Sequence, residues 1–116
     1  MKLIAQLFVG LVALEHVYIL VLEIFFWDKP KGMKTFGTTQ EFATASKALA
    51  ANQGLYNGFL AAGLFWGLLT GTTATQIFFL VCVIIAGVFG AATANTRILF
   101  VQALPAAIAL GLVLLA

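Results

Sequence analysis

Residues 3–27 read LIAQLFVGLVALEHVYILVLEIFFW, an apolar stretch that carries Glu15, His16 and Glu23. As a helix it would rise about 37 Å, whereas the hydrocarbon core of a bilayer is about 30 Å thick. An ionisable side chain inside a membrane span is costly, and it is retained where it meets a partner or water. Glu15 and His16 stand near the midpoint. The stretch therefore predicts a membrane-spanning helix with a polar site at mid-depth.

The composition of the whole chain supports a membrane protein. Of 116 residues, 63% are hydrophobic and 9% are charged, and the mean hydropathy is +1.11. A soluble domain has about 25% charged residues. The single cysteine excludes a disulfide framework within the chain. A net charge of +2, scattered along the sequence, excludes a nucleic-acid-binding surface.

The hydropathy pattern predicts an all-α integral membrane four-helix bundle, with residues 1–116 as a single domain. The expected spans are residues 3–27, 49–69, 76–94 and 98–115. We expect a polar loop after the first span and a helix start at Thr38 or Thr39, with Glu41 in the first turn. That helix would run to Thr70, which is longer than one span, so its first part would extend into the cytoplasm or the interface.

Two turns and one proline complete the expected topology. The segment GTTATQ, residues 71–76, and Asn95 to Arg97 predict short turns that make neighbouring helices antiparallel. Pro105 removes one backbone hydrogen bond from the fourth helix and predicts a kink there.

Basic residues indicate the orientation in the membrane. The first and third loops carry Lys29, Lys31, Lys34 and Arg97, whereas the other side has Lys2. The positive-inside rule then places those two loops in the cytoplasm and both termini outside.

Small residues recur every four positions along the second helix. They are Ala50, Gly54, Gly58 and Ala62, followed by Gly63, Gly67 and Gly71. Such stripes let helix backbones approach closely. They fit packing within the bundle as well as an oligomer interface.

The polar residues of the apolar segments fall at matching depths. Turned by about 100° per residue, Glu15, His16 and Glu23 share one helix face, and so do Asn52, Gln53, Tyr56 and Asn57. Gln102 in the fourth helix lies at a similar level. We expect these eight residues to form a proton- or substrate-binding column in the cytoplasmic half, with an ion pair between Glu23 and Arg97 near the surface. The other half is expected to be almost wholly apolar.

Simpler roles compete with this interpretation. The amide side chains can act purely as hydrogen bonds between helices, and Glu15 can be a protonated, silent carboxyl. Glu15 and His16 point about 100° apart, so their spacing does not favour a metal site. No cofactor is predicted, although haem held between two His16 residues of a homodimer would fit a single histidine per chain.

Three stretches carry a family resemblance: LEHVYILVLEIFFW, FGTTQEF and KALAANQGLYNGFLAAGL. They resemble a family of small bacterial four-helix membrane proteins catalogued as domain of unknown function 1304. The likeness covers nearly the whole chain and implies the four-helix fold and a location in the bacterial cytoplasmic membrane. It implies no activity.

A looser likeness concerns architecture alone. Four short spans with a glutamate in the middle of the first are similar to the small multidrug-resistance transporters, in which a dimer couples export to protonation of that glutamate. Glu15 is the matching position. The adjacent His16 and the amides of the second helix depart from that family, so the likeness is an analogy.

Three functions stay open at this point. The first is a homo-oligomeric, proton-coupled carrier of a small polar or cationic solute. The second is an accessory subunit of a larger membrane complex. The third is an intramembrane enzyme that acts on a lipid-like substrate, with a glutamate and His16 as acid and base.

Overall fold

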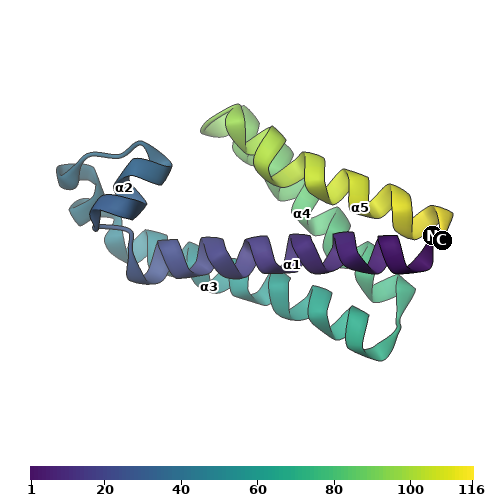
Figure 1. Ribbon diagram of the computed structural model, residues 1–116. Helices are drawn as coiled ribbons and strands as arrows, with labels where there is room; N and C mark the ends of the chain where they lie inside the picture. The colour runs from purple at the N-terminus through teal and green to yellow at the C-terminus, as the bar shows by residue number, and fades with distance from the viewer. The chain divides into compact units, whose positions relative to one another are not determined.

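The chain is all helical in a computed structural model that describes residues Met1–Ala116 (Figure 1). In order, the elements are α1 (Lys2–Phe25), α2 (Pro30–Phe36), α3 (Gln40–Thr70), α4 (Thr73–Thr93), the π-helical turn η1 (Leu99–Ala103) and α5 (Leu104–Leu115). The all-α prediction is therefore confirmed. Two of these helices, α1 and α4, are long and apolar enough to cross a membrane, judged by length and composition.

Two compact units divide the chain. Unit 1 contains Met1–Leu14 and Leu60–Ala116, and unit 2 contains Glu15–Phe59. The boundaries fall inside α1 and inside α3, so each of these helices contributes to both units. The expectation of a single domain over the whole chain stays a prediction.

Unit 1 has a core of small and medium-sized apolar side chains. Its buried members are Ala5, Val9, Val12, Ala13, Leu64, Leu80, Val83, Ala106, Ala109 and Val113. Helices α4 and α5 lie side by side in this unit (Figure 1). The side chains of alanine and valine are small, so the helix axes can come close together and the backbones can pack tightly.

Glycines make the closest helix contacts of unit 1. A Cβ atom on Gly63 would lie 2.4 Å from the Phe79 ring, and one on Gly87 would lie 2.7 Å from the backbone nitrogen of Ala103. Both distances are too short for a carbon–carbon or carbon–nitrogen contact. These glycines therefore serve packing within the chain, which favours that interpretation of the small-residue stripes over an oligomer interface.

Pro105 produces a wide turn in the last helical segment. The chain forms the π-helical turn Leu99–Ala103 directly before it, closed by a hydrogen bond from the N–H of Leu104 to the carbonyl of Leu99. Proline has no N–H and its ring collides with the preceding turn, so a locally wider helix relieves the conflict. The sequence predicts a kink at this residue, and the structure shows a π-helical turn just before it.

The connection between α3 and α4 is shorter than the predicted residues 71–76. Gly71 adopts a left-handed backbone with φ 66°. The N–H of Gly71 donates a hydrogen bond to the carbonyl of Leu68 at 3.3 Å, and the N–H of Thr72 donates one to the carbonyl of Gly67 at 2.9 Å. This pair of bonds ends α3 in a Schellman motif. Because the turn is complete at Thr72, α4 begins at Thr73, three residues earlier than predicted.

Unit 2 contains a helix where the sequence predicted only a polar loop. Helix α2 runs from Pro30 to Phe36, and Gly37, in a left-handed backbone conformation with φ 69°, caps it. Proline at the first turn and glycine just past the last are favourable helix ends. Proline and glycine are also typical of loops, so the sequence of this short segment predicts a loop rather than a helix.

Helix α3 agrees with its prediction at both ends. The hydroxyl of Thr39 accepts a hydrogen bond from the N–H of Phe42 at 3.2 Å, which is the capping interaction expected at a helix start. From Gln40 the helix continues without a break to Thr70.

Candidate functional site

Close packing of α1 against α3 positions the polar side chains of unit 2. A Cβ atom on Gly54 would lie 2.8 Å from Cγ1 of Ile24, and one on Gly58 would lie 2.6 Å from Cδ1 of Leu20. The same Gly54 position is 3.1 Å from the Cβ of Glu23. The missing side chains of these glycines let the helices pack closely, which brings side chains of α1 and α3 within hydrogen-bonding reach.

Glu23 and Asn57 form the direct polar contact between these two helices. The Nδ2 group of Asn57 donates a hydrogen bond to Oε1 of Glu23 at 2.5 Å. Both side chains are half-buried. The sequence predicted that Glu23 and Asn57 belong to one polar site, and the structure brings this pair together.

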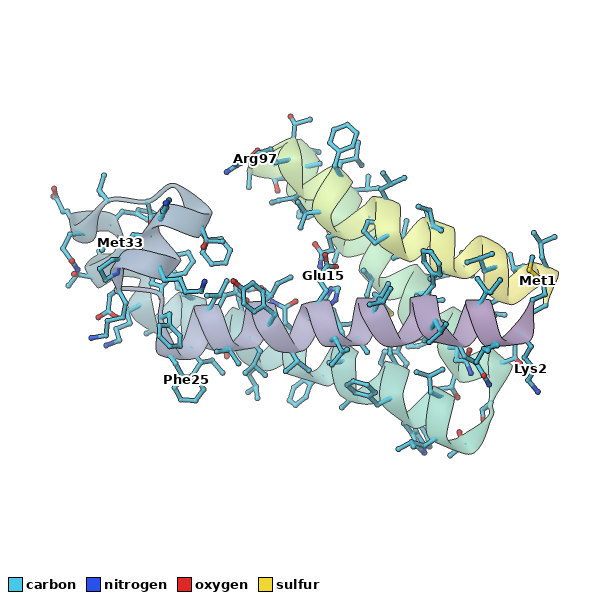
Figure 2. The ribbon with its side chains drawn as sticks, in the orientation of Figure 1. Met1, Lys2, Glu15, Phe25, Met33 and Arg97 are labelled. Atoms are coloured by element: carbon cyan, nitrogen blue, oxygen red, sulfur yellow. The ribbon has the colours of Figure 1, made fainter.

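Glu15 and His16 lie in the middle of α1 (Figure 2). The imidazole is fully buried, whereas the Glu15 side chain is 26% exposed. Their Nδ1 and Oε1 atoms are 3.9 Å apart, which is longer than a hydrogen bond. Glu15 Oε1 is itself buried and has no hydrogen-bond partner. An unsatisfied buried carboxyl oxygen is uncommon and calls for an explanation, which is often functional.

Three of the predicted site residues of α3 point elsewhere. Asn52 and Gln53 are exposed, and the Tyr56 side chain is 53% exposed and packs edge-on against Phe59. Of the four residues predicted to share one face of α3, Asn57 is the one that forms a hydrogen bond with α1.

Unit 2 also contains a cluster of polar and aromatic contacts that the sequence did not predict. Trp27 Nε1 donates a hydrogen bond to Ser46 Oγ at 3.0 Å, and the Trp27 and Phe36 rings are 5.0 Å apart. Lys47 Nζ lies 3.1 Å from Oδ2 of Asp28. The hydrogen bond from Lys47 lowers the pKa of Asp28 below its usual value. We call these five residues the α2 cap.

Gly32 and Lys31 attach α2 to the end of α1. A Cβ atom on the buried Gly32 would lie only 1.9 Å from the carbonyl oxygen of Phe26. Lys31 Nζ lies 5.8 Å from the centre of the Tyr18 ring, which is within cation–π range. These contacts join α2 to residues that precede it in the chain, so the helical periodicity of either segment does not predict them.

Gln102 and Arg97 belong to unit 1. Gln102 lies in the π turn and is half-buried, and the Arg97 side chain is exposed. The proposed partner of Arg97, Glu23, is part of unit 2. The Glu23–Arg97 ion pair and the contribution of Gln102 to the polar column therefore stay predictions.

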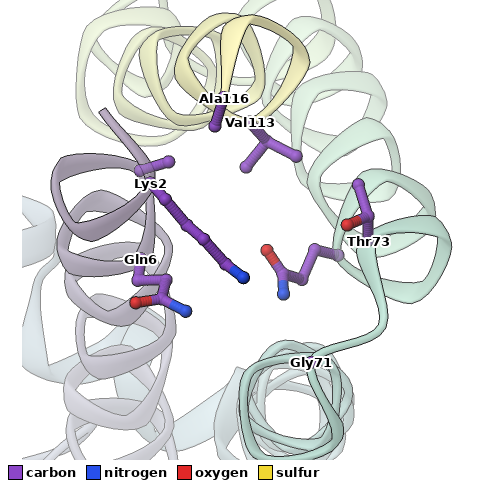
Figure 3. Close-up of a pocket in the computed structure, with 8 residues that line it drawn as sticks. Lys2, Gln6, Gly71, Thr73, Val113 and Ala116 are labelled. Carbon is purple, nitrogen blue, oxygen red and sulfur yellow. The ribbon is translucent and has the colours of Figure 1, made fainter.

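Unit 1 also contains a polar pocket that the sequence did not predict. Lys2, Gln6, Thr73 and the buried Gln76 line it (Figure 3). It brings together one lysine and two amide side chains. These side chains come from two helices that are about seventy residues apart in the sequence. Neither helix alone shows a polar pattern that would predict the pocket.

Comparison with known proteins gives a family and no activity. Residues 10–114 match the family described as "Protein of unknown function (DUF1304)". The "Uncharacterized protein YpaA" of Lactococcus lactis subsp. lactis (strain IL1403) is 31% identical over 96 residues, which are 79% of this chain and 81% of that protein. No solved structure shows a significant match to the chain.

Proposed function

The chain belongs to the DUF1304 family, whose description assigns no activity, and we propose that it is a homo-oligomeric membrane carrier that exchanges protons for a small polar or cationic solute. In this proposal Glu15 is the exchange site. The observation that carries it is the buried Oε1 atom of Glu15, which has no hydrogen-bond partner.

Exposed apolar stripes support the membrane location. On α1, Leu7, Leu11 and Leu14 are 58%, 59% and 57% exposed and recur at helical spacing. On α4, Phe78 and Ile85 are 62% and 63% exposed. Soluble monomers seldom expose contiguous apolar surface of this extent. Lipid would cover these stripes, with α1, residues 49–69 of α3, α4 and the η1–α5 segment as the four spans and the first and third loops in the cytoplasm.

The exposed polar face of α3 supports an oligomer. Asn52, Gln53 and Tyr56 share that face and are exposed, and Leu49 beside them is 70% exposed. Amides that face lipid would lack hydrogen-bond partners, which costs free energy. A second copy of the chain can cover this face and pair its amides, because interhelical amide hydrogen bonds are a common way for membrane helices to associate.

Glu15 has the properties of an exchange site in this setting. An ionised carboxylate in an apolar span must be neutralised by a proton or by a cation. A carboxyl that already accepts strong hydrogen bonds would have little to gain from either. Oε1 of Glu15 has no hydrogen-bond partner, and the side chain as a whole is 26% exposed, so a proton and a cation can compete for the same carboxyl group.

His16 and Glu23 take positioning roles in the proposal. The fully buried imidazole of His16 has no surface for a solute to touch, and this enclosure weighs against its use as an acid or base on a lipid substrate. Its charge state would adjust the electrostatic potential at Glu15, which lies 3.9 Å away. Glu23 is held by Asn57 and would keep α1 and α3 in register.

Flux through proteoliposomes tests the proposal. Guanidinium and choline serve as the probe cations, and a pH-sensitive dye inside the vesicles reports proton movement. Wild-type protein should couple inward cation flux to outward proton flux under an imposed pH gradient. Glu15→Gln keeps the size of the side chain and removes the exchangeable charge, so coupled flux should fall by tenfold or more, on the order of the loss of a principal charged contact.

Glu41→Gln is the matched control, because Glu41 is an exposed carboxyl in the first turn of α3. This variant should behave like wild type. Undiminished coupled flux in Glu15→Gln, or no proton movement in wild type with either cation, would contradict the proposal.

A further inference from the structure

A pocket of about 250 Å³ lies at one end of unit 1. It is formed by the start of α1, the turn between α3 and α4, the first turn of α4 and the end of α5, and its lining residues are Lys2, Ala5, Gln6, Gly71, Thr73, Gln76, Val113 and Ala116. All of these residues belong to unit 1. Nothing in the carrier proposal uses this pocket.

Lys2 carries the only charged side chain among the lining residues. Its ammonium group extends into the middle of the pocket, and the Gln6 amide lies on the same helix one turn further on (Figure 3). A lysine ammonium has three donors and no acceptor. None of the other lining side chains is acidic, so no carboxylate side chain in the lining competes with a ligand for the lysine.

Gln76 adds a fixed polar group to the wall of the pocket. The side chain is 7% exposed, and its Nε2 group donates a hydrogen bond to the carbonyl of Gly67 at 3.0 Å. That bond fixes the orientation of the amide and leaves Oε1 as an acceptor. A ligand that combines oxyanion atoms with a hydroxyl or N–H donor would satisfy both Lys2 and Gln76.

We propose that this pocket binds a phosphate oxyanion, either as the headgroup of an anionic phospholipid or as free phosphate. Lys2 would supply the charge, and Gln6 and Thr73 would supply neutral donors. The start of α4 adds its positive dipole end, since Thr72 makes no side-chain cap there. Phosphate oxygens accept several such donors at once.

The pocket size and its surroundings fit a headgroup. Drug-sized ligands occupy pockets of about 300–1,000 Å³, so 250 Å³ holds a headgroup and leaves acyl chains outside. Leu3 and Leu7 continue from the pocket along α1 and are 66% and 58% exposed. Acyl chains could lie against them. The inference needs neither Glu15 nor transport, so it can stand or fall independently of the carrier proposal.

Two binding measurements on the purified full-length protein test the site. Calorimetry with inorganic phosphate reports free oxyanion binding, and native mass spectrometry from nanodiscs reports the retention of phosphatidylglycerol relative to phosphatidylcholine. Lys2→Gln should weaken binding about tenfold, the size expected for one charge-assisted hydrogen bond. Lys29→Gln removes the same charge from an exposed position in unit 2 and should change binding less than about twofold, as expected for an exposed charge outside the site.

The outcomes separate the two sources of phosphate. Selective retention of phosphatidylglycerol without phosphate binding assigns a headgroup site, and the reverse assigns a site for the free anion. Equal losses in Lys2→Gln and Lys29→Gln, or no binding of either probe by wild type, would overturn the inference. Should Lys2→Gln not fold, the double variant Gln6→Leu and Thr73→Val replaces it, and unchanged binding in that variant would also overturn the inference.

Discussion

Units 1 and 2 are both packed through glycine and small side chains, yet they differ in what those contacts hold. In unit 1 the close contacts at Gly63 and Gly87 bury an aliphatic core. In unit 2 the contacts at Gly54 and Gly58 hold helices that carry Glu23 and Asn57. Close helix contacts at glycine thus support an apolar core in unit 1, whereas in unit 2 they position polar and ionisable side chains.

The two units therefore depend on different kinds of contact for their stability. Polar contacts between distant residues concentrate in unit 2, where the α2 cap and the Glu23–Asn57 bond lie. Unit 1 depends mainly on apolar burial and keeps one polar pocket at its end. Disturbing a single contact should therefore have sharper consequences in unit 2.

The largest effect is expected from Gly32→Ala. The new Cβ would lie 1.9 Å from a backbone carbonyl oxygen, and backbone cannot rotate away as a side chain can, so we expect a loss of about 3 kcal/mol in unfolding free energy. Gly111→Ala in unit 1 is the control, because no atom lies within 4 Å of its added Cβ, and alanine should raise helix stability by about 0.5–1 kcal/mol. Detergent-based unfolding followed by circular dichroism compares them. Equal stability of the two variants would remove the contrast between the units.

A smaller effect is expected from Asn57→Ala. Glu23 would lose its amide donor while staying half-buried, which costs about 1.5 kcal/mol. Asn52→Ala, five residues earlier on the exposed face of α3, should leave the stability of the monomer unchanged and weaken association of the copies. Unfolding curves and the particle mass in detergent separate these outcomes. A destabilised Asn52→Ala monomer would contradict the assignment of that face.

The smallest effect concerns Asp28 and Lys47. The hydrogen bond from Lys47 lowers the pKa of Asp28 in the folded chain, so the pair adds stability above the ordinary aspartate pKa of about 3.9 and loses it as pH falls through the folded value. Wild type and Asp28→Asn should therefore differ slightly at neutral pH and converge in acid. Trp27 fluorescence in a Trp66→Phe background measures this. A difference that grows in acid would show that the sign is wrong.

Much of the fold could be predicted because it depends on local signals. The apolar length of α1, the Thr39 cap of α3 and the disturbance at Pro105 each arise within a few residues of sequence, and each is present. Helix α2 was missed because its end signals, Pro30 and Gly37, are also loop signals. The prediction of a loop was wrong here because proline and glycine occur both at helix ends and in loops.

For the candidate site, the sequence could predict only how far along each helix the polar residues lie and which of them share a helix face. Helical periodicity placed Glu23 and Asn57 in one polar site, and they meet. It gave no rotation of α3 about its axis relative to α1, so Asn52 and Gln53 were expected to point inward and are exposed. Gly54 and Gly58 lie at the close contacts with α1, and only three-dimensional contacts reveal which side of α3 faces α1.

The central claim is that a proton and a cation compete for the Glu15 carboxyl. Adding guanidinium to the purified protein in weakly buffered detergent, with a pH-sensitive dye present, tests it most directly. Wild type and Glu41→Gln should release protons as the cation binds, and Glu15→Gln should release none. Proton release from Glu15→Gln equal to that of wild type would contradict the account.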